Sequence, residues 1–339
     1  MARPHLASII EDAFHRRTNA WLRGRGWKPR TIGHTGYGSP EFVRVLGRVV
    51  LSRSARDQPL PGAEVVQRGW RAFLTAPALN VPVTVTVNGV EARTRTDRSG
   101  YIDLTLMSPG LEPGWHEATL AADDARPMTA PVRIVDPSAG FGIISDIDDT
   151  VIRTMLPRPL IAAWNTFVRH ETARHVIPGM ARMYRTMLGE RPGAPMFYLS
   201  TGAWNTAPTL TRFLRRHGYP PGPLLLTDWG PTNTGWFRSG QQHKQDTLHR
   251  LAREFPQLQW LLVGDDGQHD PKIYNDFAMK RPDAVEAVAI RELTATEQVL
   301  SHGTPLSLPE YVPNPRRQTP VFRARDGHGL LRLLSTWHR

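Results

Sequence analysis

Alternation of apolar and polar residues dominates the first part of the chain, between about residues 40 and 135. Such alternation predicts strands that bury one face. Asn88-Gly89, a strong two-residue hairpin signal, separates two of the runs. The alternating apolar positions are Val43, Val45, Val49, Leu51, Val81, Val83, Val85, Val87, Ile102, Leu104, Leu106, Val132 and Ile134. Several short strands with regular turn signals predict a small β-sandwich domain.

From Gly140 onward, short apolar runs alternate with apolar residues at helical spacing. The runs cover 143–147, 196–199, 224–226, 260–263 and 285–290. The helical patterns include Met180, Met183, Tyr184 and Met187, then Leu210, Phe213 and Leu214, then Leu248, Leu251 and Phe255. This alternation predicts an α/β domain with a parallel, doubly wound, Rossmann-like sheet.

Two segments of this second part depart from simple alternation. The separation between the first two runs exceeds what one crossover helix needs, so we expect residues 156–174 to form a small helical lid over the site. After Ile290 the pattern weakens into a proline-containing, loop-rich tail, and Leu330 to Leu334 predict a final short helix.

The N-terminal segment has a helical apolar stripe and many basic residues. The stripe consists of Leu6, Ile9, Ile10, Ala13, Phe14 and Trp21, and the basic residues are Arg16, Arg17, Arg23, Arg25, Lys28 and Arg30. This predicts a basic amphipathic helix, whose apolar face suits either an anionic membrane surface or the protein itself. We therefore expect three parts: helix and linker in 1–37, the β-sandwich in 38–137 and the α/β domain in 138–339.

Composition narrows the possible chemistry. The 339 residues include no cysteine, which excludes disulfides, thiolate metal sites and a cysteine nucleophile. No apolar run approaches the roughly 20 residues of a transmembrane helix, and the N-terminus lacks the apolar region of a signal peptide. We expect a cytoplasmic protein, peripheral on the inner membrane face if the helix binds lipid. The net charge of +11 favours anionic partners.

Asp146 and Asp148 directly follow the first buried run of the α/β part. Residues two apart in a strand project to the same side, and the carboxyl ends of parallel strands border the ligand crevice of open α/β sheets. Two carboxylates this close repel each other unless a cation or a shared proton relieves them. We therefore expect a Mg²⁺-assisted site, although such a pair alone fits a solvated turn equally well.

Other polar residues follow the later runs in a definite order. Ser200 and Thr201 end the second run, Lys244 stands at the start of a helical pattern, and Asp265 is followed by Asp270. The combination of a carboxylate pair, a hydroxyl, a lysine and a second acidic pair is far more specific than any one part.

These residues resemble the four motifs of the haloacid-dehalogenase-like phosphatases. Asp146-Ile-Asp148-Asp149-Thr150 resembles the first motif, and Ser200, Lys244 and Asp265 with Asp270 resemble the second to fourth. Residues 140–295 further resemble the catalytic domain of actin-patch-protein phosphatidate phosphatases. That likeness rests on Phe197-Tyr-Leu-Ser200, Trp204, His243-Lys244, residues 264–274, Ile177-Pro-Gly179 with Tyr184, and Ile290-Arg291.

Two departures from that family stand near the motifs. Thr201-Gly-Ala203 replaces the usual Asn-Ser-Pro before the tryptophan, and Asp266 replaces a serine. The first difference affects contacts of the substrate loop, and the second adds negative charge beside the expected metal. The role of Asp266 is left open between ligand, neighbour of a ligand and solvated side chain.

The resemblance implies a role for each motif residue. Asp146 is the expected nucleophile, and Asp148 the acid that protonates the leaving oxygen and then the base that activates water. Ser200, Thr201, Lys244 and Thr150 are expected to bind substrate. The expected Mg²⁺ ligands are Asp146, Asp265 and the carbonyl of Asp148, while Asp270 orients Lys244 or a metal-bound water.

Several residues retain competing interpretations. Ser200 could instead cap the following segment, with Thr201 in its place, and Lys272 competes with Lys244. Trp204 suits packing as well as substrate contact. His243 and His269 do not predict a zinc site, because no third nitrogen or sulfur ligand has suitable spacing.

The sequence thus predicts a Mg²⁺-dependent phosphatase that forms an aspartyl-phosphate and acts on phosphatidate or a related lipid phosphate at an anionic membrane surface. One alternative is the same enzyme acting on a soluble phosphomonoester. The other is a non-catalytic adaptor that binds anionic lipid or nucleic acid through its basic surface. Four intact motifs argue against the adaptor, and nucleic acid is not the expected partner.

Overall fold

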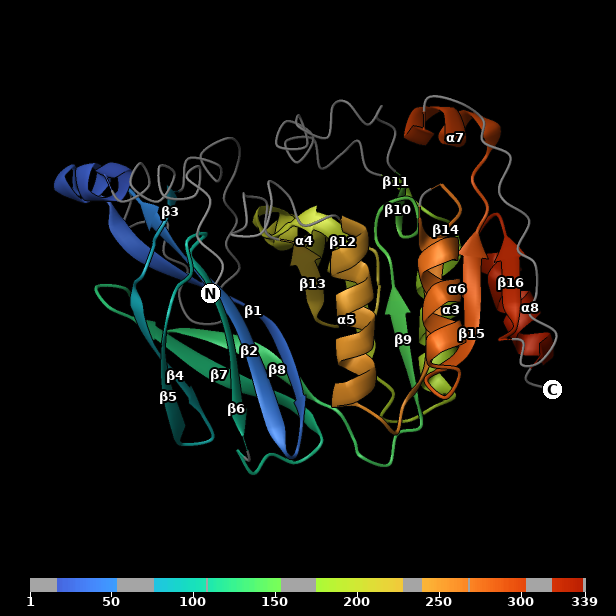
Figure 1. Ribbon diagram of the computed structural model, residues 1–339, viewed down its shortest axis with the longest axis horizontal. Helices are drawn as coiled ribbons and strands as arrows, with labels where there is room; N and C mark the ends of the chain where they lie inside the picture. Colours follow the sequence, from blue (N-terminus) through green and yellow to red (C-terminus); the bar gives the residue numbers. More distant parts are fainter. Residues whose placement is uncertain are drawn as a thin grey trace. The chain divides into compact units, whose positions relative to one another are not determined.

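A computed structural model describes residues 17–53, 76–107, 109–153, 175–227, 240–267, 269–302 and 319–337. These residues form two compact units, one up to Pro137 and one from Ser138 onward. Figure 1 labels most of their helices and strands. The predicted lid at 156–174 and the apolar positions from Leu6 to Phe14 lie outside the described residues.

The N-terminal unit is a curled sheet preceded by a short helical segment at residues 17–24. Its strands are β1 (Lys28–Ser39), β2 (Phe42–Ser52), β3 (Ala76–Pro77), β4 (Pro82–Val87), β5 (Val90–Arg95), β6 (Tyr101–Met107), β7 (Gly114–Ala122) and β8 (Met128–Ile134). They pair in the order β3-β2-β1-β8-β7-β4-β5, with β6 beside β2. The alternating valines and leucines predicted to point inward form a common core.

Strand β1 corrects the sequence interpretation, which placed a linker up to residue 37. The strand lies between β2 and β8, so its backbone is hydrogen-bonded on both sides. The glycines of β1 are typical of a loop, but in this strand they allow neighbouring strands to pack closely against its backbone. A Cβ at Gly33 would lie 2.8 Å from Cβ of Ala130, and one at Gly36 would lie 2.5 Å from the carbonyl oxygen of Arg44.

The C-terminal unit contains the predicted parallel sheet. Its strands are β9 (Phe141–Ser145), β12 (Met196–Ala203), β13 (Leu224–Thr227), β14 (Gln259–Asp265), β15 (Val285–Arg291) and β16 (Val321–Ala324), while β10 (Ile152–Arg153) and β11 (His175–Val176) form a separate antiparallel pair. Its helices are α3 (Met180–Gly189), η5 (Trp204–Thr206), α4 (Ala207–Arg216), α5 (Gly240–Glu254), α6 (Asp270–Lys280), α7 (Ala295–His302) and α8 (Gly327–Trp337). Helix α7 and edge strand β16 lie in the stretch that the sequence analysis called loop-rich. All neighbouring strands of the six-stranded sheet are parallel.

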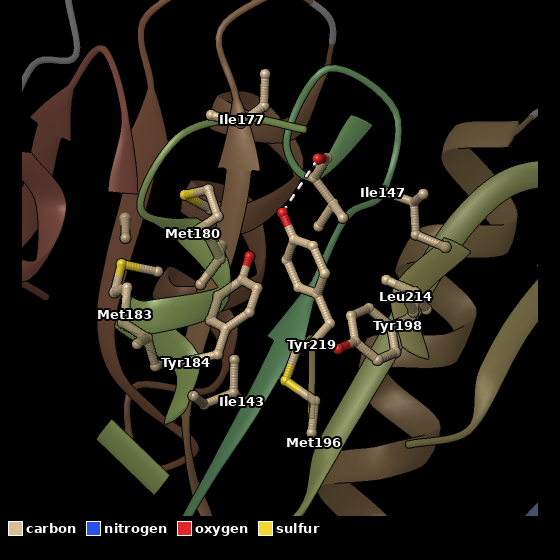
Figure 2. Close-up of a cluster of buried hydrophobic side chains, with 14 of the residues drawn as sticks. Ile143, Ile147, Ile177, Met180, Met183, Tyr184, Met196, Tyr198, Leu214 and Tyr219 are labelled. Atoms are coloured by element: carbon tan, nitrogen blue, oxygen red, sulfur yellow. Dashed lines mark hydrogen bonds between the residues drawn. The ribbon is translucent and has the colours of Figure 1, made fainter. Parts of the chain in front are cut away.

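Helices cover both faces of this sheet. Helices α5 and α6 lie on the near side in Figure 1, and α3, α4 and α8 lie on the far side. The far-side core packs methionines of α3 against the central strands, and Figure 2 shows Tyr184, Tyr198 and Tyr219 within it. On the near side, Phe255 after α5 contacts Phe197 and Trp260. Strands β9, β13, β14 and β15 are therefore mostly buried on both faces, which explains their continuous apolar sequences.

The strand order determines where a ligand can bind. In the order β13-β12-β9-β14-β15-β16, chain progression runs one way from β9 to β13 and the other way from β14 to β16. Ligands of open α/β sheets bind beyond the carboxyl ends of the two strands where this direction reverses. Here those strands are β9 and β14, which precede Asp146 and end at Asp265 respectively.

Candidate active site

Asp146 directly follows β9 and is fixed by its backbone. Its N–H donates a 2.8 Å hydrogen bond to the carbonyl of Val263 on β14. The next side chain, Ile147, is buried in the far-side core. Ser145 also holds the end of the strand. Its hydroxyl donates a 2.6 Å hydrogen bond to the carbonyl oxygen of Asp146 and lies 2.6 Å from the hydroxyl of Tyr184. The carboxylate of Asp146 is therefore carried on a rigid strand end.

Lys244, near the start of α5, connects two of the predicted acidic residues. Its ammonium donates 2.6 Å hydrogen bonds to Oδ1 of Asp146 and Oδ1 of Asp270. All three side chains are buried. The competing candidate Lys272 instead has a side chain that is 76% exposed and pairs with Asp276 on the surface. Geometry therefore favours Lys244 over Lys272 as the lysine of the site.

Asp265 completes a buried acidic cluster with Asp146 and Asp270. One oxygen from each carboxylate lies within 4.8 Å of the other two. Asp265 accepts a 2.7 Å hydrogen bond from the N–H of Gly267 and a 3.4 Å hydrogen bond from the hydroxyl of Thr150. Oδ2 of Asp270 is buried and has no hydrogen-bond partner among the described residues.

These carboxylates strongly disfavour one another's charge. Burial, the largest cause, raises the pKa of Asp146 well above its usual range, and Asp270 and Asp148 raise it further while Lys244 opposes the shift. Burial and the charges of Asp270 and Asp146 likewise raise the pKa of Asp265. The pKa of Lys244 is raised because the two carboxylates outweigh the desolvation of its ammonium. Either a cation or a retained proton would relieve this repulsion.

A divalent cation fits this donor set. With all three carboxyls ionised, the cluster and the ammonium of Lys244 would together carry two net negative charges in a buried space. The donors are hard oxygens of the kind that Mg²⁺ prefers. The unpartnered oxygen of Asp270 adds a buried acceptor that a cation could satisfy.

Ser200 lies beside the second predicted catalytic carboxylate. Its hydroxyl donates a 2.9 Å hydrogen bond to Oδ2 of Asp148 and accepts one of 2.9 Å from the N–H of Gly202. No side-chain cap is formed at the start of η5 or α4, but the bond from Gly202 shows that Ser200 also caps the backbone just after it, as the competing interpretation expected. Ser200 and Asp148 thus form a pair next to the acidic cluster.

The two threonines assigned to substrate binding are placed differently. The hydroxyl of Thr150 faces Asp265. Thr201 follows Ser200 on β12, and its carbonyl accepts a 2.8 Å hydrogen bond from the hydroxyl of Thr227. Thr150 therefore contacts the acidic cluster itself, while Thr201 is held at its backbone.

Asp266, which the sequence left unassigned, anchors a neighbouring loop. Its Oδ1 accepts a 2.8 Å hydrogen bond from the N–H of Leu293, and its own N–H donates to the carbonyl of Arg291. Burial raises the pKa of this carboxyl. Trp204 packs against the far-side core, as the packing interpretation predicted. Sequence reasoning missed the contacts of Ser145 and Arg291, for which residue spacing gives no signal.

Comparison with known proteins confirms the resemblance to the catalytic domain of actin-patch-protein phosphatidate phosphatases. Residues 141–292 match the family described as "Phosphatidate phosphatase APP1, catalytic domain". This range contains Asp146, Asp148, Ser200, Lys244, Asp265 and Asp270.

Two curated fungal proteins are similar over the same part of the chain. Phosphatidate phosphatase APP1 of Saccharomyces cerevisiae is 30% identical over 164 residues, covering 48% of this chain and 27% of the relative. An uncharacterized protein of Schizosaccharomyces pombe is 25% identical over 155 residues, covering 45% of this chain and 25% of the relative. The chain therefore spans about a quarter of the length of the curated relatives it matches.

Among solved structures, an immunoglobulin-like domain of the M. primoryensis ice-binding adhesin aligns with a TM-score of 0.17 at 14% identity, covering 32% of this chain and 93% of that one. A carbohydrate acetylesterase of Xanthomonas citri aligns with a TM-score of 0.25 at 10% identity, covering 80% of this chain and 74% of that one.

Proposed function

We propose that this protein is a Mg²⁺-dependent phosphatase with a haloacid-dehalogenase-like, doubly wound catalytic domain, and that phosphatidate is its substrate. One observation carries the proposal. Lys244 joins Asp146 and Asp270, and Asp265 lies beside them, at the point between β9 and β14 where the order of the parallel strands reverses. The family match of residues 141–292 supports the substrate class.

Asp146 and Asp265 would hold Mg²⁺ with the backbone carbonyl of Asp148, and Asp270 would support the cluster through Lys244. When bound, Mg²⁺ supplies charge that offsets the repulsion between a phosphate dianion and an approaching carboxylate. Lys244 supplies part of the same compensation from the protein, because its ammonium already contacts Asp146.

The proposed reaction divides the work between two aspartates. A carboxylate oxygen of Asp146 forms a bond to phosphorus as the bond to the leaving alkoxide oxygen breaks, which gives an aspartyl-phosphate. Asp148 donates its proton to that oxygen and then removes one from the water that hydrolyses the intermediate. The hydroxyl of Ser200, which donates to Asp148 in the absence of substrate, would turn its hydrogen bond to a phosphoryl oxygen when substrate binds. The products are an alcohol and inorganic phosphate.

The segment before β1 has features that suit an anionic lipid surface. Within the helical residues 17–24, Leu22 enters the core of the N-terminal unit, whereas Trp21 is 54% exposed. The guanidinium of Arg25 lies 3.9 Å from the centre of the Trp21 ring. No helix among the described residues has the length and apolar character of a membrane span. We propose that Trp21 and Arg25 contribute to peripheral binding at a phosphatidate-containing membrane.

The test is phosphate release from phosphatidate vesicles with Mg²⁺. Asp146→Asn should reduce release to background because an amide cannot act as the nucleophile, and chelation should do the same to the wild type. Asp283→Asn is the matched control, because the exposed carboxylate of Asp283 forms a surface pair with Arg281. Equal release by wild type and Asp146→Asn would refute the catalytic assignment.

A soluble phosphomonoester is the second candidate substrate. A panel of nucleotide and sugar phosphates distinguishes it from phosphatidate. Trp21→Ala should lower turnover on vesicles but leave turnover of soluble esters unchanged. Trp115→Ala provides a second exposed tryptophan as control, since its ring also lies near an arginine, Arg133. Faster cleavage of a soluble ester than of vesicles would assign the substrate to the soluble class.

A further inference from the structure

The turn that follows Asp148 is held by side chains from distant parts of the chain. Asp149 has a positive φ of 58°, a backbone conformation that costs a non-glycine residue energy. Its N–H donates to the carbonyl of Ile152 at 2.8 Å, and the N–H groups of Val151 and Ile152 donate back to the carbonyl of Ile147. The carbonyls of Asp149 and Val151 receive their hydrogen bonds from outside the turn.

Arg291 donates to the first of these carbonyls. It ends β15 beside Asp265 in the register of the sheet, and its side chain is buried. Nη1 donates a 2.7 Å hydrogen bond to the carbonyl of Asp149. The other two nitrogens of the guanidinium also donate hydrogen bonds. Nη2 donates to Oε1 of Glu297 at 2.7 Å, and Nε donates to the carbonyl of Arg325 at 3.2 Å. A lysine could not reproduce this three-way arrangement.

Tyr219, in the segment after α4, donates to the second carbonyl, which also accepts a 3.2 Å hydrogen bond from the N–H of Ile177. Its hydroxyl lies 3.2 Å from the carbonyl oxygen of Val151, and Figure 2 draws this hydrogen bond as a dashed line. The ring is buried in the far-side core beside Tyr184. Among the residues that the structure describes, no hydrogen bond or ion pair joins the side chain of Tyr219 or Arg291 to Asp146, Asp265 or Asp270.

We propose that Arg291 and Tyr219 are positioning residues that fix the turn 149–152 and, through it, the acid/base carboxylate of Asp148. The proposal rests on the proposed phosphatase function. Asp148 is joined to this turn through the peptide bond to Asp149, whose N–H and carbonyl are both fixed. Ser200 restrains the other end of Asp148 through its carboxylate. Loosening the turn should therefore misplace the proton donor while leaving Asp146 on its strand.

The leaving group distinguishes this role from general structural support. An alkoxide leaving group needs protonation by Asp148, whereas a nitrophenolate departs with little help. The substrates are dioctanoyl phosphatidate in detergent and p-nitrophenyl phosphate, assayed on the full chain with Mg²⁺. The measured quantity is kcat/KM, which covers the steps through departure of the leaving group. Asp148→Asn provides the reference pattern for loss of the acid.

Arg291→Lys and Tyr219→Phe should each lower kcat/KM on phosphatidate about tenfold or more, and on p-nitrophenyl phosphate by less than about threefold. Tyr198→Phe is the matched control, because its hydroxyl binds the carbonyl of Pro220 instead of the turn. It should change neither value. Equal losses on the two substrates in both variants, with Tyr198→Phe unaffected, would overturn the positioning role.

Hydrogen–deuterium exchange of the peptide that spans residues 146–153 tests the restraint independently of activity. Exchange there should quicken in Arg291→Lys and Tyr219→Phe and stay at the wild-type rate in Tyr198→Phe. Unchanged exchange in both variants would overturn the proposal even if activity fell. If the wild type hydrolyses neither ester but exchange is faster in the variants, the phosphatase function is refuted. The restraint of the turn by Arg291 and Tyr219 would then still hold.

Discussion

The ammonium of Lys244 lies 2.6 Å from Oδ1 of Asp146, and both groups are buried. The same ammonium also lies 2.6 Å from Oδ1 of Asp270, so one lysine neutralises part of the charge of two carboxylates. Removing one member of a buried ion pair leaves the other charge without compensation, which is more costly than the net contribution of the pair. Lys244 therefore links the stability of the domain to its proposed chemistry.

Replacing Lys244 by methionine should lower kcat/KM on phosphatidate by about 100-fold or more, because one positive group facing the phosphoryl charge is lost. The free energy of unfolding should fall by about 3 kcal/mol near neutral pH, because Asp146 and Asp270 lose their shared partner. Kinetic assays and urea titration measure the two effects.

Lys272→Met is the control for Lys244→Met. Lys272 is largely exposed and forms a surface pair with Asp276, so activity should not change and stability should change by less than about 0.5 kcal/mol. Similar losses in the two variants would show that Lys244 has no special role.

Binding of Mg²⁺ should be detectable without any substrate. Because the cluster carries excess negative charge, Mg²⁺ at 100 times its Kd should stabilise the wild type by about 2.7 kcal/mol. Asp265→Asn should abolish most of this gain, and Asp283→Asn, on the surface, should retain it. Thermal unfolding with and without Mg²⁺ measures the shift. A full shift in Asp265→Asn would remove this residue from the metal site.

Gly264 provides a steric test of the Asp270 position. A Cβ at Gly264 would lie 2.6 Å from Oδ2 of Asp270 and 2.8 Å from the ring of Tyr274. Gly264→Ala should therefore displace Asp270 from Lys244, lower activity about tenfold and cost about 1–3 kcal/mol of stability. Gly189→Ala meets no atom within 4 Å and should leave activity unchanged. Wild-type activity in Gly264→Ala would show that the position of Asp270 is unimportant.

The sequence predicted the parts of this architecture that depend on local pattern. The apolar runs of β9 and β14, followed by Asp146 and Asp265, indicate strand ends, and parallel pairing then brings those ends together. Strand β1 was missed because long-range pairing with β2 and β8 outweighs a glycine-rich composition. Arg291 lies 142 residues from Asp149 in the chain, so no spacing rule could reveal their hydrogen bond.

His34 should make the N-terminal unit sensitive to acid. Burial, with a smaller contribution from Arg48, lowers the pKa of this imidazole to about 3. The unfolded chain binds a proton on this group below a pKa of about 6.5, whereas the folded chain does not until the pH nears 3. Since the unfolded state then holds more protons, stability falls as the pH drops through this window, by up to about 1.4 kcal/mol per pH unit.

His34→Gln removes the titrating group and should flatten that slope. The difference in unfolding free energy between wild type and variant isolates this contribution, since other acid effects are common to both. Hydrogen–deuterium exchange of peptides from β1 and β2 in the full chain measures the N-terminal unit separately from the C-terminal one. Parallel pH dependences for the two proteins would contradict the prediction, because they would place the imidazole in an environment that tolerates its charge.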